Sequence, residues 1–549
     1  MKQIDLIKIY QKKRCLVIDD LSEIRGSIKR MLKVFGAEEV DTAANGEEAM
    51  ELCLAHSYDI VLCDYNLGKG KDGQQILEEL RYRGVLKNTS LYIMITAETS
   101  RDMVLGALEY QPDDYVTKPI TQSSLRARLD KALVRHEALY GIKKAIDRKQ
   151  YKEAVEQCEK VIAEESRYES ICRNMQAELY QRLKKFDKAR EIYEKVLEDS
   201  PAVWAKLGLG KTLIELKEYA EAEAVLKEVL DVDNRYVEAH DLLAVLYSAQ
   251  GDALRAQGAM KKAVDVSPKS VLRQRRLAAL AYKNQDIETS VKACRNTVKL
   301  SQNSCYETPQ DYFNLAGRLA DAMKQNGADS NRASKEAFEI LQKAEQKYPR
   351  DKSINLQLAA VKSRVYAAKK DGKEAEKWAD AARDLYIEIE DEVDIDASME
   401  YAHTLMEAGD QQAARRILER IVKENPNDDD VAEQIDSLSD EPVSKRGKLQ
   451  VSELTKKGIQ CYESKEFEEA IHIFQNAVAI YPKHIGLNLN LVQVILAECD
   501  AHGIQRQYRA MCRKCLGTVK DIGQDNPQFE RYNYLKQQAA HCFPEHSAS

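Results

Sequence analysis

Short apolar runs separated by amphipathic stretches dominate the first 120 residues. Apolar residues fill RCLVI before Asp19, IVLC before Asp64 and LYIMI before Thr96, without the alternation expected when one sheet face is in water. Such runs predict buried parallel strands, and the 3.6-residue spacing between them predicts helices. The pattern predicts strands at 14–19, 39–43, 58–64, 90–96 and 114–117, and helices at 22–35, 46–55, 72–83 and 99–109.

Polar side chains stand where four of these strands end. Asp19 and Asp20 follow the first strand, Asp64 ends the third, Thr96 ends the fourth and Lys118 follows the fifth. Parallel open sheets hold their ligands beyond the carboxyl ends of the strands, so these side chains are expected in one cluster. Three carboxylates in one place repel one another, which a hard divalent cation such as Mg²⁺ relieves. A carboxylate can attack phosphorus, an ammonium can balance phosphoryl charge, and a hydroxyl can donate to a phosphoryl oxygen.

The residues that end these strands, at their spacing, resemble those of a response-regulator receiver domain over residues 12–135: Asp19-Asp20, Asp64, Thr96-Ala97 and Lys118-Pro119. The resemblance implies a flavodoxin-like α/β fold, with a five-stranded parallel sheet of strand order 2-1-3-4-5. It also implies a bacterial two-component signalling protein that is phosphorylated on an aspartate.

The resemblance assigns the acceptor and the metal ligands. Asp64 would be the phosphoacceptor. Mg²⁺, or another divalent cation, would be held by Asp20 directly, by Asp19 through water, by Asp64 and by the backbone carbonyl of Asn66. The loop after the acceptor departs from the family pattern, because it is one residue longer and has Gly68 where proline is common.

The resemblance also assigns the residues that respond to the phosphoryl group. Thr96 and Lys118 would contact it, and Tyr115 would turn inward on activation. Asn66 and Glu98 would tune the lifetime of the phosphoryl group. The peptide bond after Lys118 would be cis, since it precedes proline.

A 34-residue period follows the receiver. Leu residues recur in register with small residues at two further positions, which together are Leu209, Leu243 and Leu277; Gly210, Ala244 and Ala278; and Ala222, Ala256 and Ser290. Small residues are needed where two antiparallel helices cross closely. This period and pattern resemble the tetratricopeptide repeat (TPR) and predict an all-α TPR solenoid.

Apolar residues keep helical spacing from Gln122 through Lys149, so a helix is expected to run from the receiver into the repeats. We predict a receiver domain at 1–135, a first TPR block at 136–430, a polar linker or partial break at 431–450, and a C-terminal TPR block with a capping helix at 451–549.

Composition narrows the function classes. The chain has 549 residues, 44% hydrophobic and 32% charged, which indicates a soluble protein of several domains. Its net charge of −7 argues against a nucleic-acid partner. No secretory signal or membrane span is present, and the 12 scattered cysteines suit reduced thiols, so a cytoplasmic protein without a membrane partner is predicted. CRKC at 512–515 has a metal or redox spacing, but it also places two cysteines on one helix face.

No glycine-loop, nucleophile-elbow or zinc-protease motif is present, so we predict no enzyme beyond the receiver's own phosphotransfer and autodephosphorylation. The favoured hypothesis is a response regulator that a sensor histidine kinase or phosphotransfer protein phosphorylates. Its TPR groove would then bind a protein or peptide in a phosphorylation-dependent way. By the TPR resemblance, groove positions include Lys211, Glu238, Asp241, Arg275, Tyr282 and Lys283.

Two alternatives of other classes stay open. The chain could be a constitutive TPR scaffold whose receiver is incidental. It could also be a regulator that binds RNA or DNA through its helical repeats, in which case binding would be strongly salt-dependent. A homodimer is also compatible with the sequence.

Overall fold

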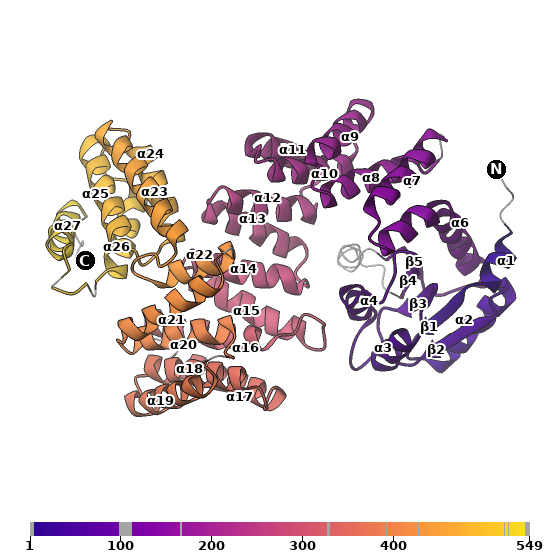
Figure 1. The fold of residues 1–549 in the computed structure, drawn as a ribbon, viewed down its shortest axis with the longest axis horizontal. Coiled ribbons are helices and arrows are strands. Elements are labelled where there is room, and N and C mark those ends of the chain that lie inside the picture. Colours follow the sequence, from indigo (N-terminus) through magenta and orange to yellow (C-terminus); the bar gives the residue numbers. More distant parts are fainter. Residues whose placement is uncertain are drawn as a thin grey trace, which may run out of the picture. The chain divides into compact units, whose positions relative to one another are not determined.

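The computed structural model describes residues 5–97, 112–164, 167–326, 330–390, 392–426, 428–520, 522–524 and 526–543 (Figure 1). The helix expected at 99–109 lies outside these residues. The chain forms two compact units. Unit 1 contains Met1–Leu246, Gly258–Gln274 and Asn296–Glu307, and unit 2 contains Tyr247–Gln257, Arg275–Arg295 and Thr308–Ser549. The predicted domain boundaries remain predictions.

The amino-terminal domain is built on a five-stranded parallel sheet, as expected. The strand order is β2-β1-β3-β4-β5, which is the predicted 2-1-3-4-5 order. Strand ends agree with the sequence pattern to within two residues. The strands are β1 (Arg14–Ile18), β2 (Glu39–Ala43), β3 (Ile60–Asp64), β4 (Leu91–Thr96) and β5 (Asp114–Thr117).

Both faces of the sheet are buried, which explains the continuous apolar runs. Successive residues of each strand enter different cores: Val17 and Leu62 belong to one cluster, and Leu16 and Val61 belong to the other. Helices α2 (Ser22–Phe35) and α6 (Gln122–Asp147) cover the first face. Helices α3 (Gly46–Ala55) and α4 (Gly73–Tyr82) cover the second.

Helix α1 (Leu6–Gln11) was not predicted from the sequence. Its Tyr10 is fully buried, and the Tyr10 hydroxyl donates to Asp130 on α6 at 2.9 Å. Six residues are too few to form a stable helix alone, so packing against α6 decides this element.

Helix α6 runs without interruption for 26 residues, as the apolar spacing predicted. Leu125 and Leu129 belong to the receiver core, whereas Leu139 and Ile142 pack against the first helical repeat. Near its end, Asp147 accepts hydrogen bonds from the receiver loop at 88–89, at 2.7 to 3.0 Å. One rigid element therefore belongs to both cores.

Helical pairs follow α6 through most of the remaining chain (Figure 1). The predicted small positions are where helices cross: a Cβ on Gly210 would lie 2.7 Å from Leu226 Cδ2, and Ala222, Ala256 and Ser290 are fully buried. The helices are α7 (Tyr151–Ala163), α8 (Glu169–Arg182), α9 (Phe186–Asp199), α10 (Val203–Glu215), α11 (Tyr219–Val232), α12 (Val237–Ala249), α13 (Ala253–Val266), α14 (Val271–Lys283), α15 (Ile287–Ser301), α16 (Pro309–Asn326), α17 (Ser330–Lys347), α18 (Lys352–Ala368), α19 (Gly372–Ile389), α20 (Ile395–Glu407) and α21 (Gln411–Glu424).

The stretch at 431–450, predicted to be a polar linker or partial break, is mostly helical. Helix α22 (Asp429–Leu438) fills its first part and α23 (Lys445–Glu463) begins in its second. Buried Asp436 ties the turn between them, because its carboxylate accepts from the Val443 and Ser444 backbone amides at 2.7 and 2.8 Å. The burial of Asp436 could not be predicted from the sequence, because the residue stands among other charged residues in a polar stretch.

The C-terminal block follows, and its expected capping helix corresponds to α27. Its helices after α23 are α24 (Phe467–Ile480), α25 (Ile485–His502), α26 (Arg506–Thr518) and α27 (Phe529–Cys542). Among the helices of the described ranges, none is both long and apolar enough to cross a membrane.

Candidate functional site

Three carboxylates meet at the carboxyl edge of the sheet. Asp19 and Asp20 follow β1, and Asp64 ends the adjacent strand β3, because Ile18 pairs with Cys63 in the parallel register. One oxygen from each of the three carboxylates lies within 4.8 Å of the other two. Asp19 is fully buried, Asp64 is 5% exposed and Asp20 is exposed. Oxygen ligands from carboxylates with one open side are the donor set that Mg²⁺ prefers, so these residues fit a divalent cation.

Lys118 brings its ammonium group into this acidic cluster. Its Nζ lies 2.8 Å from Asp64 Oδ2 and 3.0 Å from Asp19 Oδ2. Burial would lower the pKa of Lys118, but the hydrogen bonds to Asp64 and Asp19 outweigh it and raise that pKa. The peptide bond from Lys118 to Pro119 is cis, as expected. Lys118 is therefore a charged partner of the Asp64 carboxylate.

The pKa of the Asp64 carboxyl is raised above its usual value. Burial is the main cause, and the negative charges of Asp19 and Asp20 add to it, against the lowering effect of Lys118. The acids thus repel one another even with Lys118 present, and a cation bound among them would stabilise the ionised form of Asp64.

This raised pKa predicts how stability depends on pH without a metal ion. An acid whose pKa is higher in the folded state stabilises the fold below its unfolded pKa and loses that contribution as pH rises through its folded pKa. Asp64→Asn removes the titration and keeps the shape. In EDTA, we expect the variant's free energy of unfolding to exceed that of the wild type increasingly as pH rises from about 3.5 to 7. Urea titrations at several pH values measure this difference, and a gap that shrinks as pH rises would contradict it.

The loop after Asp64 turns tightly against this residue. Asn66 is exposed, and its side-chain oxygen accepts from the Gly68 amide at 3.2 Å. Gly68 has a φ of +77°, a left-handed conformation that proline cannot adopt. This explains why glycine replaces the usual proline in the longer loop. The next contact is at Gly73, the first residue of α4, where an added Cβ would lie 2.3 Å from the carbonyl oxygen of Asp64.

Gly73 was not identified from the sequence, although an Asp-Gly pair at a helix start was a visible signal. Gly73→Ala is expected to push α4 away from the acceptor strand and to lower the free energy of unfolding by about 1–3 kcal/mol. Gly258→Ala is a matched control, because Gly258 lies in α13 with no atom within 4 Å of an added Cβ. The control should change stability by about 1 kcal/mol or less, in the stabilising direction. Equal effects in chemical denaturation would contradict the packing argument.

The structure places Thr96 and Tyr115 on the two strands beyond the acceptor. Thr96 ends β4, and its carbonyl accepts from the Lys118 amide at 2.8 Å. Tyr115 on β5 is partly buried, and its buried hydroxyl has no hydrogen-bond partner among the described residues. Burial raises the pKa of that hydroxyl. Glu98 lies outside the described residues.

The predicted groove residues lie on first helices of the repeats and are largely engaged within the chain. In unit 1, Asp241 pairs with Arg273 at 2.7 Å, and burial together with the charge of Asp241 raises the pKa of Glu238, while the positive charge of Lys211 lowers it. In unit 2, Arg275 pairs with Asp311 at 2.9 Å. Tyr282 lies under the guanidinium of Arg318, whose carbon is 3.1 Å from the ring centre, and Lys283 pairs with Glu433.

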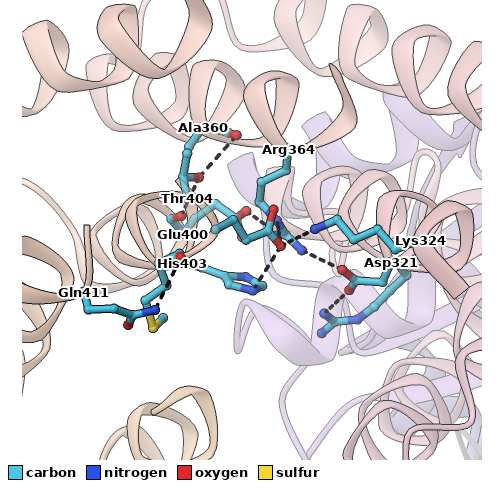
Figure 2. A network of polar contacts seen from close by, with 11 residues as sticks. Asp321, Lys324, Ala360, Arg364, Glu400, His403, Thr404 and Gln411 are labelled. Atoms are coloured by element: carbon cyan, nitrogen blue, oxygen red, sulfur yellow. Dashed lines mark hydrogen bonds and ion pairs between the residues drawn. The ribbon is translucent and has the colours of Figure 1, made fainter. Parts of the chain in front are cut away.

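A buried ionic network, which we call the Arg364 network, joins three first helices of unit 2 (Figure 2). Arg364 on α18 is 2% exposed, and it reaches Asp321 on α16 at 3.1 Å. On α20 it reaches Glu400 at 2.6 Å and Glu407 at 3.3 Å. Lys324 of α16 also pairs with Glu407, at 2.6 Å. The sequence reasoning missed this network, whose signal was an arginine within the apolar run LQLAAVKSRVY.

The CRKC motif places two cysteines on one buried helix face, and this supports a packing role for them rather than a metal or redox site. Cys512 and Cys515 are both buried on α26, in the apolar core of the C-terminal block. Burial raises the pKa of both thiols, to about 12 for Cys515. All 12 cysteines are free thiols. Within the described part of the chain, Asp19, Asp20 and Asp64 form the one group of three acidic, cysteine or histidine ligands close enough to hold a metal ion.

Comparison with protein families supports this assignment of the two regions. The family described as the response regulator receiver domain matches residues 15–130. A tetratricopeptide-repeat family matches residues 396–428, and the family described as anaphase-promoting complex, cyclosome, subunit 3 matches residues 147–229.

Individual relatives match the same receiver region. The chain is 30% identical over 122 residues to the chemotaxis protein CheY-3 of Vibrio cholerae. The aligned region covers 22% of this chain and 92% of that protein. It is 37% identical over 121 residues to the probable transcriptional regulator ycf27 of Cyanidium caldarium, over 22% of this chain and 46% of that protein. A solved CheY-like receiver domain from Methanospirillum hungatei is 28% identical, with a TM-score of 0.21, over 23% of this chain and 96% of that one. The chain therefore belongs to the response-regulator receiver family, and its receiver domain is joined to tetratricopeptide repeats.

Proposed function

We propose that Asp64 accepts a phosphoryl group from a phosphohistidine of a sensor kinase or phosphotransfer protein. The carrying observation is the position of the Asp64 carboxylate, at the open edge of the sheet, beside Asp19 and Asp20 and 2.8 Å from Lys118 Nζ. A carboxylate oxygen of Asp64 would attack phosphorus in line, the phosphorus–nitrogen bond of the donor would break, and the imidazole would leave with its electron pair and take up a proton.

The neighbouring residues support this transfer. Asp19, Asp20, Asp64 and the Asn66 carbonyl would hold Mg²⁺, which supplies positive charge to the phosphoryl oxygens. Lys118 now shares its ammonium between Asp64 and Asp19, and it would exchange the Asp64 contact for a phosphoryl oxygen. Thr96, at the end of the adjacent strand β4, would donate its hydroxyl to another phosphoryl oxygen, and Tyr115 and Glu98 would respond to the change and tune its lifetime.

The output of the receiver would be binding of a protein or peptide by the TPR solenoid. Two observations support coupling between the two regions. Helix α6 contributes Leu125 to the receiver core and Leu139 to the first repeat core. Asp147, at its far end, holds the receiver loop at 88–89 by four hydrogen bonds. A shift of the receiver would therefore move the first repeat, because no flexible linker separates them.

Affinity capture with two forms of the full chain tests this output. One bait is the wild type loaded with beryllofluoride and Mg²⁺, which mimics the phosphoryl group, and the other is Asp64→Ala under the same conditions. We expect at least one partner to be enriched about tenfold or more on one bait, which corresponds to a coupling free energy of about 1.4 kcal/mol. Equal recovery of every partner would instead favour a constitutive scaffold. Recovery of nucleic acid that falls steeply with salt would favour the nucleic-acid hypothesis.

A further inference from the structure

The first-helix layer of unit 2 contains a buried arginine. Arg364 contacts the first helices on both sides of its own, yet its side chain is 2% exposed. Long arginine side chains on an open surface normally keep the guanidinium in water. Its guanidinium is packed between α16 and α20, where a Cβ on Gly317 would lie 3.1 Å from Nη1.

The turn between α24 and α25 supplies one covering group. Burial is the main reason that the pKa of Lys483 in this turn is lowered, while the negative charges of Asp440, Glu407 and Asp321 act in the opposite direction. Lys483 also lowers the pKa of buried His403 on α20, after burial and the charge of Arg364. Lys483 of the C-terminal block therefore interacts electrostatically with charged residues of α16, α18 and α20.

Two more contacts of the same kind lie at the end of α14. Lys283 pairs with Glu433 on α22. Lys514 on α26 donates from Nζ to the backbone carbonyl of Asn284 at 3.2 Å. A Cβ on Gly251 would also lie 3.8 Å from Ile480 Cδ1 at the end of α24. These contacts all belong to unit 2, and they link its earlier repeats to α22, α24 and α26.

The charge of Lys483 opposes the packing of the C-terminal block against the first helices. The Lys483 ammonium has no hydrogen bond or ion pair within the described ranges, although the lysine is partly buried. Burying an unpaired charge opposes the closed arrangement, and opening would return that charge to water. The Lys283–Glu433 pair and the Lys514 hydrogen bond favour closure. The closed arrangement is thus held by a few polar contacts and opposed by the unpaired charge of Lys483. Such a balance is suited to reversible opening of the C-terminal block.

We propose that the C-terminal segments α22–α27 close over the first-helix face of α14–α20 and compete there with the partner protein. The chain's own C-terminal block is thus the resident occupant of this face, and a partner binds by displacing it. This rests on the proposed function only in taking the TPR solenoid as the output surface. The closure itself needs neither phosphorylation nor a partner.

Charge reversal of both lysines tests closure in the full chain without partner or phosphodonor. In Lys283→Glu/Lys514→Glu, we expect hydrogen exchange of backbone amides at 277–286 to rise about tenfold or more, with a larger radius of gyration in solution scattering. Lys283→Glu/Glu433→Lys restores an ion pair and should return exchange toward the wild type. Lys343→Glu is the control, because Lys343 is an exposed lysine on α17 that forms no ion pair within the described chain, and it should leave exchange unchanged.

A second variant shifts the equilibrium in the opposite direction. Lys483→Met removes the unpaired ammonium and keeps a flexible apolar chain, so exchange at 277–286 should fall below that of the wild type. If Lys283→Glu/Lys514→Glu unfolds the protein, Lys483→Met still tests closure. Unchanged or faster exchange in Lys483→Met, or unchanged exchange and radius in a folded double reversal, would overturn closure. Because neither readout uses Asp64, failure of phosphorylation is recognised separately.

Discussion

Asp64→Ala is expected to abolish phosphoryl incorporation from a small-molecule phosphodonor such as acetyl phosphate with Mg²⁺. The variant loses the carboxylate that we propose as the nucleophile, whose Oδ2 lies 2.8 Å from Lys118 Nζ. Asp19 cannot replace it, since it is fully buried and its oxygens already accept from Lys118 and from the Leu21 amide at 3.0 and 2.9 Å. Incorporation should fall by about 100-fold or more, to the level of the unfolded protein.

Intact-protein mass spectrometry measures the phosphorylated fraction directly. Glu51→Ala is the matched control, because Glu51 is an exposed acid of the same domain on α3, away from the strand ends. The control should be phosphorylated like the wild type. Full phosphorylation of Asp64→Ala would move the acceptor to another residue and would remove the basis of the proposed function.

Arg364→Met is expected to destabilise the solenoid by about 3–5 kcal/mol, which is a large part of the stability of a typical protein. Methionine keeps much of the side-chain volume but leaves Asp321 and Glu400 without their arginine partner in a buried place. Glu407 would keep Lys324, and Asp321 would keep only its 3.9 Å ion pair with Arg318, so the loss falls mainly on Glu400 and on the Asp321 oxygen that faced Arg364 (Figure 2). Removing one member of a buried ionic group costs more than the group contributed, because unpaired charges stay behind.

Urea unfolding followed by fluorescence reports this change in unit 2. Trp378 on α19 packs at the edge of the unit 2 core, and Trp204→Phe removes the signal of the other tryptophan. Arg415→Met is the control: its side chain is 52% exposed and pairs only along its own helix with Glu419, so it should change stability by about 0.5 kcal/mol or less. Similar midpoints for the two variants would show that the Arg364 network contributes no more than a surface pair.

Arg364→Lys separates charge from geometry. Lysine keeps one positive charge but cannot reach three carboxylates through a planar fork, so its stability should lie between the wild type and Arg364→Met. Together with the closure contacts, this makes the first-helix face of unit 2 a charged and mostly internally satisfied surface. A partner for that face must offer better pairing than the chain's own C-terminal block does.

The receiver fold could be predicted from the sequence alone, and so could the cluster of three acids and Lys118 at one edge of its sheet. Parallel strands buried on both faces give continuous apolar runs, and the residues that end such strands meet at one edge whatever the loops do. Asp19, Asp20, Asp64 and Lys118 could therefore be identified from local patterns. The helical repeats could likewise be predicted from the 34-residue period. Each repeat has its own small residue, Gly, Ala or Ser, where its two helices cross, so the signal is local to the repeat.

Which of the remaining charges meet depends on the folded chain. Arg364 joins residues of three repeats, Asp436 is buried within a polar stretch, and Lys514 donates to the backbone carbonyl of Asn284, far earlier in the chain. A charged residue carries no local mark that tells burial from exposure, because its partner comes from a distant segment that only folding brings near. For this reason the predicted groove residues Asp241, Arg275 and Lys283 were placed on the expected helices, whereas their partners within the chain were not predicted.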